Sequence, residues 1–344
     1  MKTVAKHWHV IDEEQKRVQC DLCPHECKLK DGQFGICGVR KNEEGKLVTF
    51  TYGTLVSAAV DPIEKKPLYH FLPGHLTFTI ATPGCNFKCL GCQNWEISQV
   101  PPKLADRVPL FIETSVPPEV VVQKAIETGC KSISFSYTEP TIYFEYMYDI
   151  ARIAKEHGLK TVMVSNAFIN EEPLEQLLEV IDAFAYDLKF FSDESYRKYA
   201  KGRLEPVLRT IKKTFEAGKW IEITTLLVPQ YLDEKQIRDI AYWIKDELAP
   251  WVPWHVSRFF PYYKAQDLPP TPMEMIEYAV SVGKEAGLYY VYAGNIPHTD
   301  WENTYCPQCG ELLIERFGYT LKRYNLVDCG KCPRCGRQTE GVFC

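Results

Sequence analysis

Several features are scarce or missing in this chain of 344 residues. Basic residues do not outnumber acidic ones, because 40 Lys and Arg stand against 45 Asp and Glu and leave a net charge of -5. The charge therefore gives no reason to expect a nucleic-acid partner. No apolar run approaches the roughly 18 residues of a membrane span. The first residues, MKTVAKHWHVIDEEQKR, are too charged for a secretory signal. We therefore expect a cytoplasmic protein that binds neither nucleic acid nor a membrane.

The sequence also has no internal repeat and no GxGxxG motif after its first core strand, which weakens a dinucleotide-binding interpretation. Between residues 76 and 300, short apolar runs alternate with amphipathic segments. This pattern predicts strands at 76–82, 132–136, 161–165, 183–188, 220–228, 254–260 and 289–293, and helices at 117–128, 142–156, 172–180, 205–217, 233–248 and 272–286. Such alternation is typical of an α/β fold with a parallel sheet, here a partial or full (β/α) barrel.

Cysteine is the residue type that is unexpectedly abundant, with 14 in the chain. In a cytoplasmic protein, so many thiols more often bind metal than form disulfides. Cys130 is interpreted as a small core residue, and Cys344 as a free terminal thiol. The other twelve form three groups, each with its own spacing: Cys20, Cys23, Cys27 and Cys37; Cys85, Cys89 and Cys92; and Cys306, Cys309, Cys329, Cys332 and Cys335.

The central group lies in GCNFKCLGCQNW, directly after the first core strand. A tight loop with this spacing can direct three thiolates to one iron–sulfur cluster. A [4Fe–4S] cube has four irons, so three thiolates leave one iron without a protein ligand. An open coordination position marks a catalytic metal site. The alternatives are a zinc loop or half of a ferredoxin.

A CxxxCxxC loop after a first barrel strand resembles the radical S-adenosylmethionine (SAM) superfamily. The resemblance implies a partial (β/α)6-type TIM barrel in which SAM binds the open iron of a [4Fe–4S] cluster. It further implies that a low-potential electron donor reduces the cluster, and that SAM is cleaved to methionine and a 5′-deoxyadenosyl radical. That radical abstracts hydrogen from a substrate that the sequence does not identify.

A closer resemblance extends over nearly the whole chain. The stretches CDLCPHEC, DPIEKKPLYHFLPG, TPGCNFKCLGCQNWEIS, SFSYTEPTIYFEY, YDLKFF, HVSRFFPYYK and VYAGN are together similar to the radical SAM enzyme of the AmmeMemoRadiSam system, which is related to pyruvate formate-lyase activating enzymes. This resemblance implies Memo-like and AMMECR-like companion proteins. Two alternatives remain: a glycyl-radical-enzyme activase that acts on a protein partner, and a zinc-binding scaffold protein.

The resemblance also assigns residues to SAM binding, although no catalytic residue is predicted. The superfamily usually carries a GGE-type motif after its second strand. This chain has Ser136, Tyr137, Thr138 and Glu139 there, without the glycines. Glu139 would accept a hydrogen bond from the SAM ammonium, or else belong to a turn before Pro140. Further contacts to SAM or to the substrate cavity are expected at the ends of later strands, from Asn166, Asp187, Lys189 and Asn295.

Two further observations concern single positions of the core. On the strand at 254–260, His255 and Ser257 share one face while Arg258 lies on the other, so all three cannot face the barrel interior. Many superfamily members have an aromatic residue directly before the last cluster cysteine, and this chain has Gly91. Whether Phe87 or Trp95 replaces that aromatic residue is open.

Two cysteine modules flank the predicted core at 76–300. In the C-terminal tail, 301–344, two CPxCG knuckles resemble a zinc ribbon and predict zinc, or a rubredoxin-like iron, bound by Cys306, Cys309, Cys332 and Cys335. Cys329 is a spare thiol or an alternative ligand. The N-terminal module and connector, 1–75, predict zinc or an auxiliary iron–sulfur cluster bound by Cys20, Cys23, Cys27 and Cys37, because both accept four thiolates. His25 lies in the same loop and is an alternative ligand.

Overall fold

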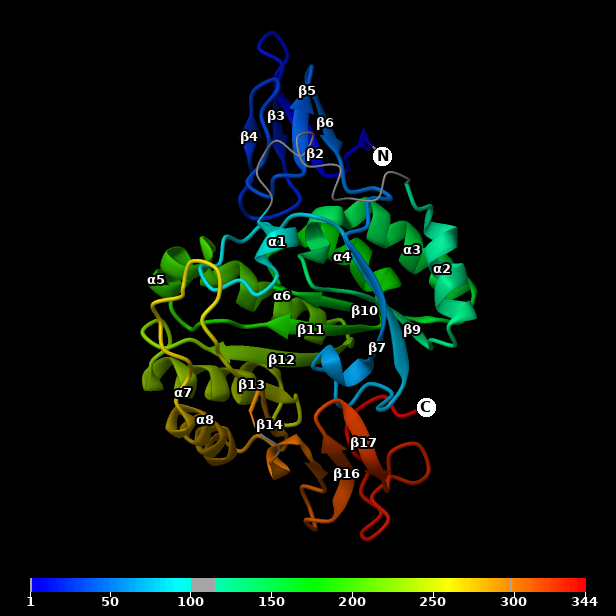
Figure 1. The fold of residues 1–344 in the computed structure, drawn as a ribbon, viewed down its shortest axis with the longest axis vertical. Helices are drawn as coiled ribbons and strands as arrows, with labels where there is room; N and C mark the ends of the chain where they lie inside the picture. Colours follow the sequence, from blue (N-terminus) through cyan, green and yellow to red (C-terminus); the bar gives the residue numbers. More distant parts are fainter. Residues whose placement is uncertain (1, 100–114, 297–298) are drawn as a thin grey trace.

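The computed structural model describes residues 2–99, 115–296 and 299–344, arranged as one large sheet with a small module at each end (Figure 1). The large sheet has the strand order β14-β13-β12-β11-β10-β9-β8-β7. No helix in the described residues is long and apolar enough to cross a membrane. The parallel strands of the sheet are β8 (Leu76–Ala81), β9 (Ser132–Phe135), β10 (Lys160–Ser165), β11 (Ala183–Asp187), β12 (Trp220–Leu227), β13 (Trp254–Arg258) and β14 (Val291–Gly294).

The order of these strands distinguishes two α/β architectures. A doubly wound sheet reverses its strand order at a switch point, whereas strands added one after another in the same direction curl into a barrel. From β8 to β14 each strand pairs with the next in the chain, without reversal. Within the described residues β14 pairs only with β13, so the barrel stays open. The predicted partial (β/α) barrel is confirmed.

Helices connect the strands and cover the outer face of the sheet (Figure 1). Those that the periodicity predicted are α2 (Pro118–Glu127), α3 (Phe144–Glu156), α4 (Glu171–Val180), α6 (Leu204–Glu216), α7 (Glu234–Trp243) and α8 (Met273–Ala286). The end of the predicted helix 233–248 is a π-helical turn, Ile244–Leu248, after α7. The sequence pattern missed α1 (Trp95–Ser98), α5 (Asp193–Ser195) and the π turn Tyr196–Ala200, which are too short to show a period.

At the edge of the large sheet, β7 (Ser57–Pro62) pairs antiparallel with β8. The predicted boundary at residue 75 therefore falls between two paired strands. A short 3-10 helix, Ile63–Lys65, follows β7.

The N-terminal module consists of two three-stranded antiparallel sheets that stand above α1 and α3 in Figure 1. One contains β1 (Thr3–Val4), β6 (Lys46–Thr49) and β5 (Arg40–Glu43); the other contains β2 (Trp8–Asp12), β3 (Arg17–Cys20) and β4 (Lys28–Leu29). A buried ion pair joins this module to the core, because the guanidinium of Arg40 lies 2.9 Å from the carboxylate of Glu145 on α3.

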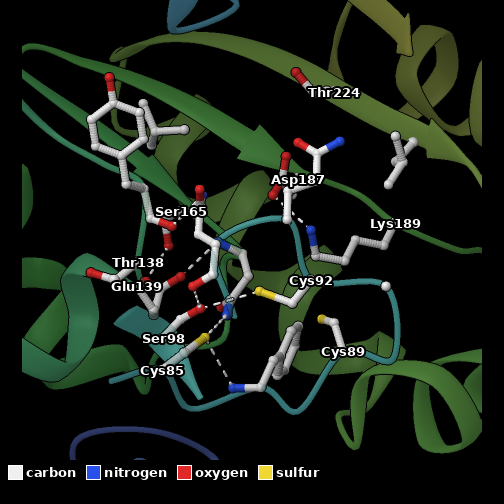
Figure 2. Close-up of a pocket in the computed structure, with 18 of the residues that line it drawn as sticks. Cys85, Cys89, Cys92, Ser98, Thr138, Glu139, Ser165, Asp187, Lys189 and Thr224 are labelled. Carbon is white, nitrogen blue, oxygen red and sulfur yellow. Dashed lines mark hydrogen bonds and ion pairs between the residues drawn. The ribbon is translucent and has the colours of Figure 1, made fainter. Parts of the chain in front are cut away.

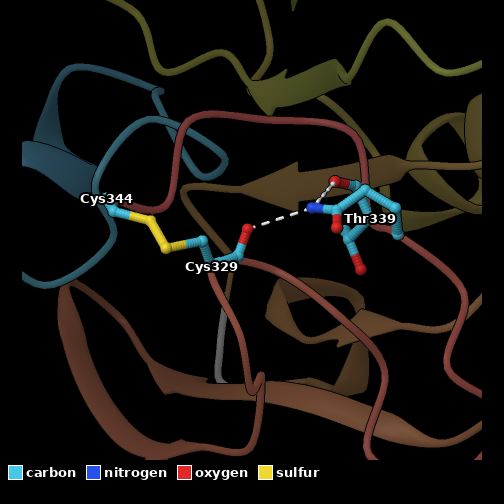
Figure 3. Close-up of a disulfide and its surroundings, with 4 residues drawn as sticks. Cys329, Thr339 and Cys344 are labelled. Carbon is cyan, nitrogen blue, oxygen red and sulfur yellow. Dashed lines mark hydrogen bonds between the residues drawn. A yellow bond between two sulfur atoms is a disulfide. The ribbon is translucent and has the colours of Figure 1, made fainter.

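The C-terminal module is an antiparallel sheet of β15 (Thr304–Tyr305), β16 (Leu312–Phe317) and β17 (Thr320–Tyr324), preceded by a 3-10 helix, Asp300–Glu302. Its last residues form a disulfide between Cys329 and Cys344 (Figure 3). The interpretation of Cys344 as a free thiol and of Cys329 as a spare ligand is therefore wrong. The chain end is brought back because the backbone of Val342 exchanges hydrogen bonds with His70 and Leu72.

Buried polar side chains close the amino-terminal half of the barrel, and we call them the floor cluster. The Glu222 carboxylate on β12 accepts hydrogen bonds from the backbone N–H groups of Tyr69 and His70 and contacts Nε2 of His255 at 2.7 Å. Arg316 on β16 donates to the carbonyl of Tyr69 at 2.8 Å, and its guanidinium lies 4.2 Å from the centre of the Tyr69 ring. These contacts join the C-terminal module to the barrel.

We expect that His70, in the floor cluster, makes the folded protein less stable at acidic pH. Its Nδ1 donates to the carbonyl of Glu340, its Nε2 accepts from Tyr292, and burial lowers the pKa of His70 from 6.5 to about 4. The unfolded chain binds this proton below about pH 6.5, whereas the folded chain resists it until about pH 4. The free energy of unfolding should therefore decrease by up to about 3 kcal/mol as the pH falls from about 6.5 to about 4.

Denaturant unfolding at pH 7.5 and pH 5 measures this loss in the free energy of unfolding. The variant His70→Gln should show a smaller difference between the two pH values. An equal difference in both proteins would show that His70 is not the group that titrates.

Candidate active site

The loop after β8 carries the three central cysteines at the carboxyl end of the parallel strands (Figure 2). Its shape is held by backbone hydrogen bonds to the turn after α5, from Lys88 N to Ala200 O at 2.8 Å and from Leu90 N to Tyr199 O at 3.0 Å. The loop thereby directs three thiols into one cavity of about 470 Å³. This volume lies within the usual range for a small-molecule site.

The thiols lie in an environment that disfavours free thiolates. Burial raises the pKa of Cys89 to about 12 and that of Cys85 well above its usual range. Burial alone would lower the pKa of Lys189, but Asp187 and then Cys89 raise it above its ordinary value, so this side chain is a cation. A metal that binds here must displace the thiol protons, and the charge of Lys189 partly balances the thiolates that result.

Glu139 lies in the wall of the same cavity and is almost fully buried. Its Oε1 accepts hydrogen bonds from the backbone N–H and the hydroxyl of Thr141 and from the hydroxyl of Ser165, while Oε2 accepts one from the backbone N–H of Asn166 at 2.9 Å. The carboxylate thus caps the helix that Pro140 begins and joins the ends of β9 and β10. Because a carboxylate has about four acceptor positions, Oε2 retains capacity for one more donor.

The turn 136–138, where the superfamily usually has glycine, forms without one. Tyr137 adopts φ +65°, a left-handed conformation that costs a non-glycine residue about 1 kcal/mol. Its hydroxyl donates a 2.5 Å hydrogen bond to Asp61, which offsets that cost. The hydroxyl of Thr138 donates to the carbonyl of Thr82 at 2.7 Å. Ser136, Tyr137 and Thr138 all line the cavity.

The other predicted SAM contacts line this cavity as well. Asn166 donates from Nδ2 to Oδ1 of Asn86 in the cysteine loop at 2.8 Å, so its amide also orients that loop. Lys189 and Asp187 form an ion pair at 2.7 Å. Asn295 follows β14 with φ +59°. The structure therefore brings together all eight residues that the sequence assigned to SAM, while their contacts with SAM remain a prediction.

The three candidate residues on the strand predicted at 254–260 have different surroundings in the structure. His255 points into the floor cluster, and Ser257 lines the cavity. Arg258 donates from Nε to the carbonyl of Thr271 at 2.9 Å.

Among the cavity-lining residues that sequence reasoning missed are Lys65, Thr224 and Tyr319. The hydroxyl of Thr224 is buried and has no hydrogen-bond partner in the described part of the chain. The sequence did contain a pattern that indicates Thr224. It lies on the same strand face as Glu222, and polar residues at alternate positions of a strand indicate the face that points into the barrel. No local signal pointed to Tyr319, which comes from the turn between β16 and β17.

Gly91 cannot carry the aromatic side chain that many superfamily members have at this position. A Cβ there would approach the hydroxyl of Tyr199 and come within 2.7 Å of the Phe259 ring. The Gly91 N–H donates to that hydroxyl at 3.1 Å. Phe87 lines the cavity, whereas Trp95 stacks on Tyr263 at 5.2 Å. Of the two candidates, only Phe87 faces the space where SAM is expected.

The four C-terminal cysteines form a compact group of a different kind. The sulfurs of Cys306, Cys309, Cys332 and Cys335 all lie within 4.8 Å of one another. The pairs Cys306–Cys335 and Cys309–Cys332 are each 3.6 Å apart. A tetrahedral site with Zn–S bonds of about 2.3 Å requires sulfurs about 3.8 Å apart, so this group can hold one metal ion.

The central cysteines fit a cluster with one open iron better than a single ion. In the described residues, the C-terminal cysteines are the one group of three or more potential ligands close enough to hold a single metal ion. The cavity wall contains three thiols and no histidine. Three thiolates around a wide cavity match the ligand set of a [4Fe–4S] cube that leaves one iron to a small molecule.

Comparison with known proteins agrees with this geometry. The family profile described as "Radical SAM superfamily" matches residues 79–241. The uncharacterized protein MJ0808 of Methanocaldococcus jannaschii is 46% identical over 332 residues, which are 96% of this chain and 97% of that protein. The same organism has a proposed glycyl-radical enzyme activating enzyme, MJ1227, that is 28% identical over 171 residues, 47% of this chain and 66% of that protein.

Among solved structures, Streptococcus suis SuiB bound to S-adenosylmethionine is similar with a TM-score of 0.50 and 16% identity. The similarity covers 68% of this chain and 53% of that chain. At this level of identity it supports the fold.

Proposed function

Because the chain belongs to the radical SAM superfamily, we propose that it cleaves S-adenosylmethionine reductively at a [4Fe–4S] cluster bound by Cys85, Cys89 and Cys92. When bound, the cluster and SAM supply the 5′-deoxyadenosyl radical that abstracts a hydrogen atom from the substrate. The observation that carries this proposal is the cavity with three thiols and no further cysteine or histidine among its described lining residues.

The residues around the cavity have separate tasks in this proposal. Oε2 of Glu139 accepts a hydrogen bond from the SAM ammonium, in addition to the one that it accepts from Asn166. Lys189, as a cation beside Cys89, balances the charge of the thiolates. Thr224 offers its unpartnered hydroxyl to a bound molecule, since a buried hydroxyl without a partner is costly. Phe87 offers an apolar surface at the cluster.

The test is anaerobic. The protein is reconstituted with iron and sulfide, reduced with dithionite and supplied with SAM, and 5′-deoxyadenosine is measured by chromatography. Formation of 5′-deoxyadenosine supports the proposal. If none forms, the EPR spectrum of the reduced cluster is recorded with and without SAM, because cleavage can require the substrate. A spectrum that SAM leaves unchanged would contradict the proposal.

Glu139→Gln is expected to weaken SAM binding by about 10- to 100-fold, because a charge-assisted hydrogen bond contributes about 1.5–3 kcal/mol. The dissociation constant is measured from the SAM-dependent change in the EPR spectrum. The matched control is Ser165→Ala, which removes one donor to Glu139 and leaves its carboxylate in place. Equal losses of affinity in both variants would mean that Glu139 acts only by holding the two strand ends together.

We infer further that the chain is the radical SAM member of an AmmeMemoRadiSam system, with Memo-like and AMMECR-like companion proteins. The motifs shared over nearly the whole chain, from CDLCPHEC to VYAGN, support this assignment. Co-purification of the three proteins from one host tests it.

A second candidate function is activation of a glycyl-radical enzyme by abstraction of hydrogen from a backbone glycine. The similarity to MJ1227 favours it. A glycyl-radical EPR signal in a partner protein after incubation with SAM and reductant would support it.

A further inference from the structure

The N-terminal cysteines surround a small enclosed cavity that the proposed reaction does not use. All four thiols line it: Cys20, Cys23, Cys27 and Cys37. Cys20 and Cys37 are buried, and Cys23 and Cys27 are partly buried. The four thiols therefore face one common space in the interior of the N-terminal module.

The arrangement of the thiols distinguishes a cluster from a single metal ion. The C-terminal thiols of this chain serve as an internal reference for a single-ion site, since all four lie within 4.8 Å of one another. In the part of the chain that the structure describes, no three of the N-terminal thiols form a comparable group that could hold one metal ion. In an iron–sulfur cluster the thiolates bind different irons, so their sulfurs lie farther apart than around one ion.

A buried arginine provides an independent observation. Arg40 lines the same cavity and is 1% exposed. Its Nη2 donates to Glu145 and to the carbonyl of Lys6, but Nε and Nη1 have no partner in the described residues. Its charge interacts with the thiols of Cys20, Cys37 and Cys23. Buried N–H donors without acceptors are costly, and the sulfur atoms of a cluster are acceptors that would satisfy them.

We propose that Cys20, Cys23, Cys27 and Cys37 bind a second iron–sulfur cluster, and that Arg40 donates hydrogen bonds to its sulfur atoms. A cluster with four thiolates carries net negative charge, which the buried guanidinium offsets. Four cysteine ligands leave no iron open, so this cluster does not bind SAM. The assignment is independent of the proposed function, because it concerns a separate set of ligands.

The N-terminal cysteine site lies next to the loop that carries the central cysteines. Nε2 of His25 donates to the carbonyl of Asn86 in the central loop at 2.8 Å. A Cβ on Gly84, the residue before Cys85, would come within 2.9 Å of the carbonyl oxygen of Cys37. The backbones of the two cysteine loops are therefore in direct contact, and His25 serves as a link between them.

The test uses the full-length chain with Cys85, Cys89 and Cys92 replaced by alanine, so that any sulfide belongs to the N-terminal site. After anaerobic reconstitution, iron, zinc and acid-labile sulfide are measured per chain. We expect about two to four sulfides, according to the cluster type, and one metal ion at the C-terminal site. The further exchanges Cys20→Ser and Cys37→Ser should remove all sulfide. Absence of sulfide with two zinc ions per chain would overturn the proposal.

Arg40→Lys gives a second readout if the cysteine variants fold poorly. This variant keeps the positive charge beside Glu145 but loses the planar set of N–H donors. Hydrogen bonds to cluster sulfurs raise the reduction potential. In the otherwise unchanged chain, which holds both clusters, the EPR-monitored potential of one cluster should therefore become more negative while that of the other stays the same. An unchanged potential would overturn the assignment of Arg40 as a donor to the cluster.

Discussion

Cys85→Ala is expected to reduce formation of 5′-deoxyadenosine to the level of a protein-free control. Loss of an outer-shell partner of a metal ligand typically costs 10- to 100-fold, and loss of one of three ligands should cost more. The cavity wall offers no substitute, because the described residues that line it include no other thiol and no imidazole. Iron and sulfide in the central site should fall together with the activity.

The matched control is Cys130→Ala, which removes a buried thiol that lies far in sequence from any of the three cysteine groups. Cys130 follows α2 and packs in the hydrophobic core. Its replacement should cost about 1 kcal/mol of stability and leave SAM cleavage unchanged. Retention of SAM cleavage in Cys85→Ala would contradict the three-thiolate site.

Cys332→Ser is expected to release the metal ion of the C-terminal module and to unfold β16 and β17. Zinc binding contributes about 10–16 kcal/mol to the folding of small zinc-finger peptides. This module has only a small core of its own, formed by Leu313, Ile314 and Leu326 with the buried cysteines. Metal analysis and hydrogen exchange of residues 301–344 measure the two effects.

The consequences should extend to the barrel. Arg316 belongs to β16 and donates to the carbonyl of Tyr69, so unfolding of the module removes a buried cation from the floor cluster. Tyr319, which lines the cavity, is displaced with it. We therefore expect that loss of this distant metal ion also lowers SAM affinity.

The comparison variant is Cys344→Ser, which opens the disulfide and leaves the four metal ligands in place. Because Cys329 and Cys344 are 15 residues apart, the disulfide stabilises by about 3 kcal/mol at most. The C-terminal module should keep its one metal ion, because its four ligands are unchanged. Equal effects of Cys332→Ser and Cys344→Ser on hydrogen exchange would mean that the metal ion does not hold the module together.

The sequence predicted well those helices and strands whose beginning and end are determined by adjacent residues. Helix α8 illustrates this, since Pro272 precedes it and Gly287, with φ +92°, follows its last residue. The regular alternation of strands and helices determined the α/β fold, and the partial barrel followed from it. The predicted SAM contacts line one cavity because the carboxyl ends of parallel strands meet at one edge of the sheet.

Contacts between distant segments escaped prediction. The disulfide is the clearest case, because the expectation of reduced thiols in the cytoplasm argued against it. The docking of Val342 on the connector, together with hydrogen bonds from Thr339 to Gly330 and from Gln338 to Cys329, brings Cys344 back to Cys329. Likewise, the pairing of β7 with β8 and the place of Glu222 under Tyr69 depend on how the sheet curves.

The sequence by itself thus determined the order of the elements, the three cysteine groups and the superfamily, because each is recorded in short-range spacing and periodicity. The tertiary structure decided which groups face one another: Thr224 faces the cavity, Arg40 faces the N-terminal thiols, and Tyr319 lines the same cavity as the central cysteines, which lie far from it in the sequence. The physical reason is that burial and hydrogen bonding are properties of neighbours in space. A local sequence pattern can indicate that a residue is buried, but it cannot identify the residue that its side chain contacts.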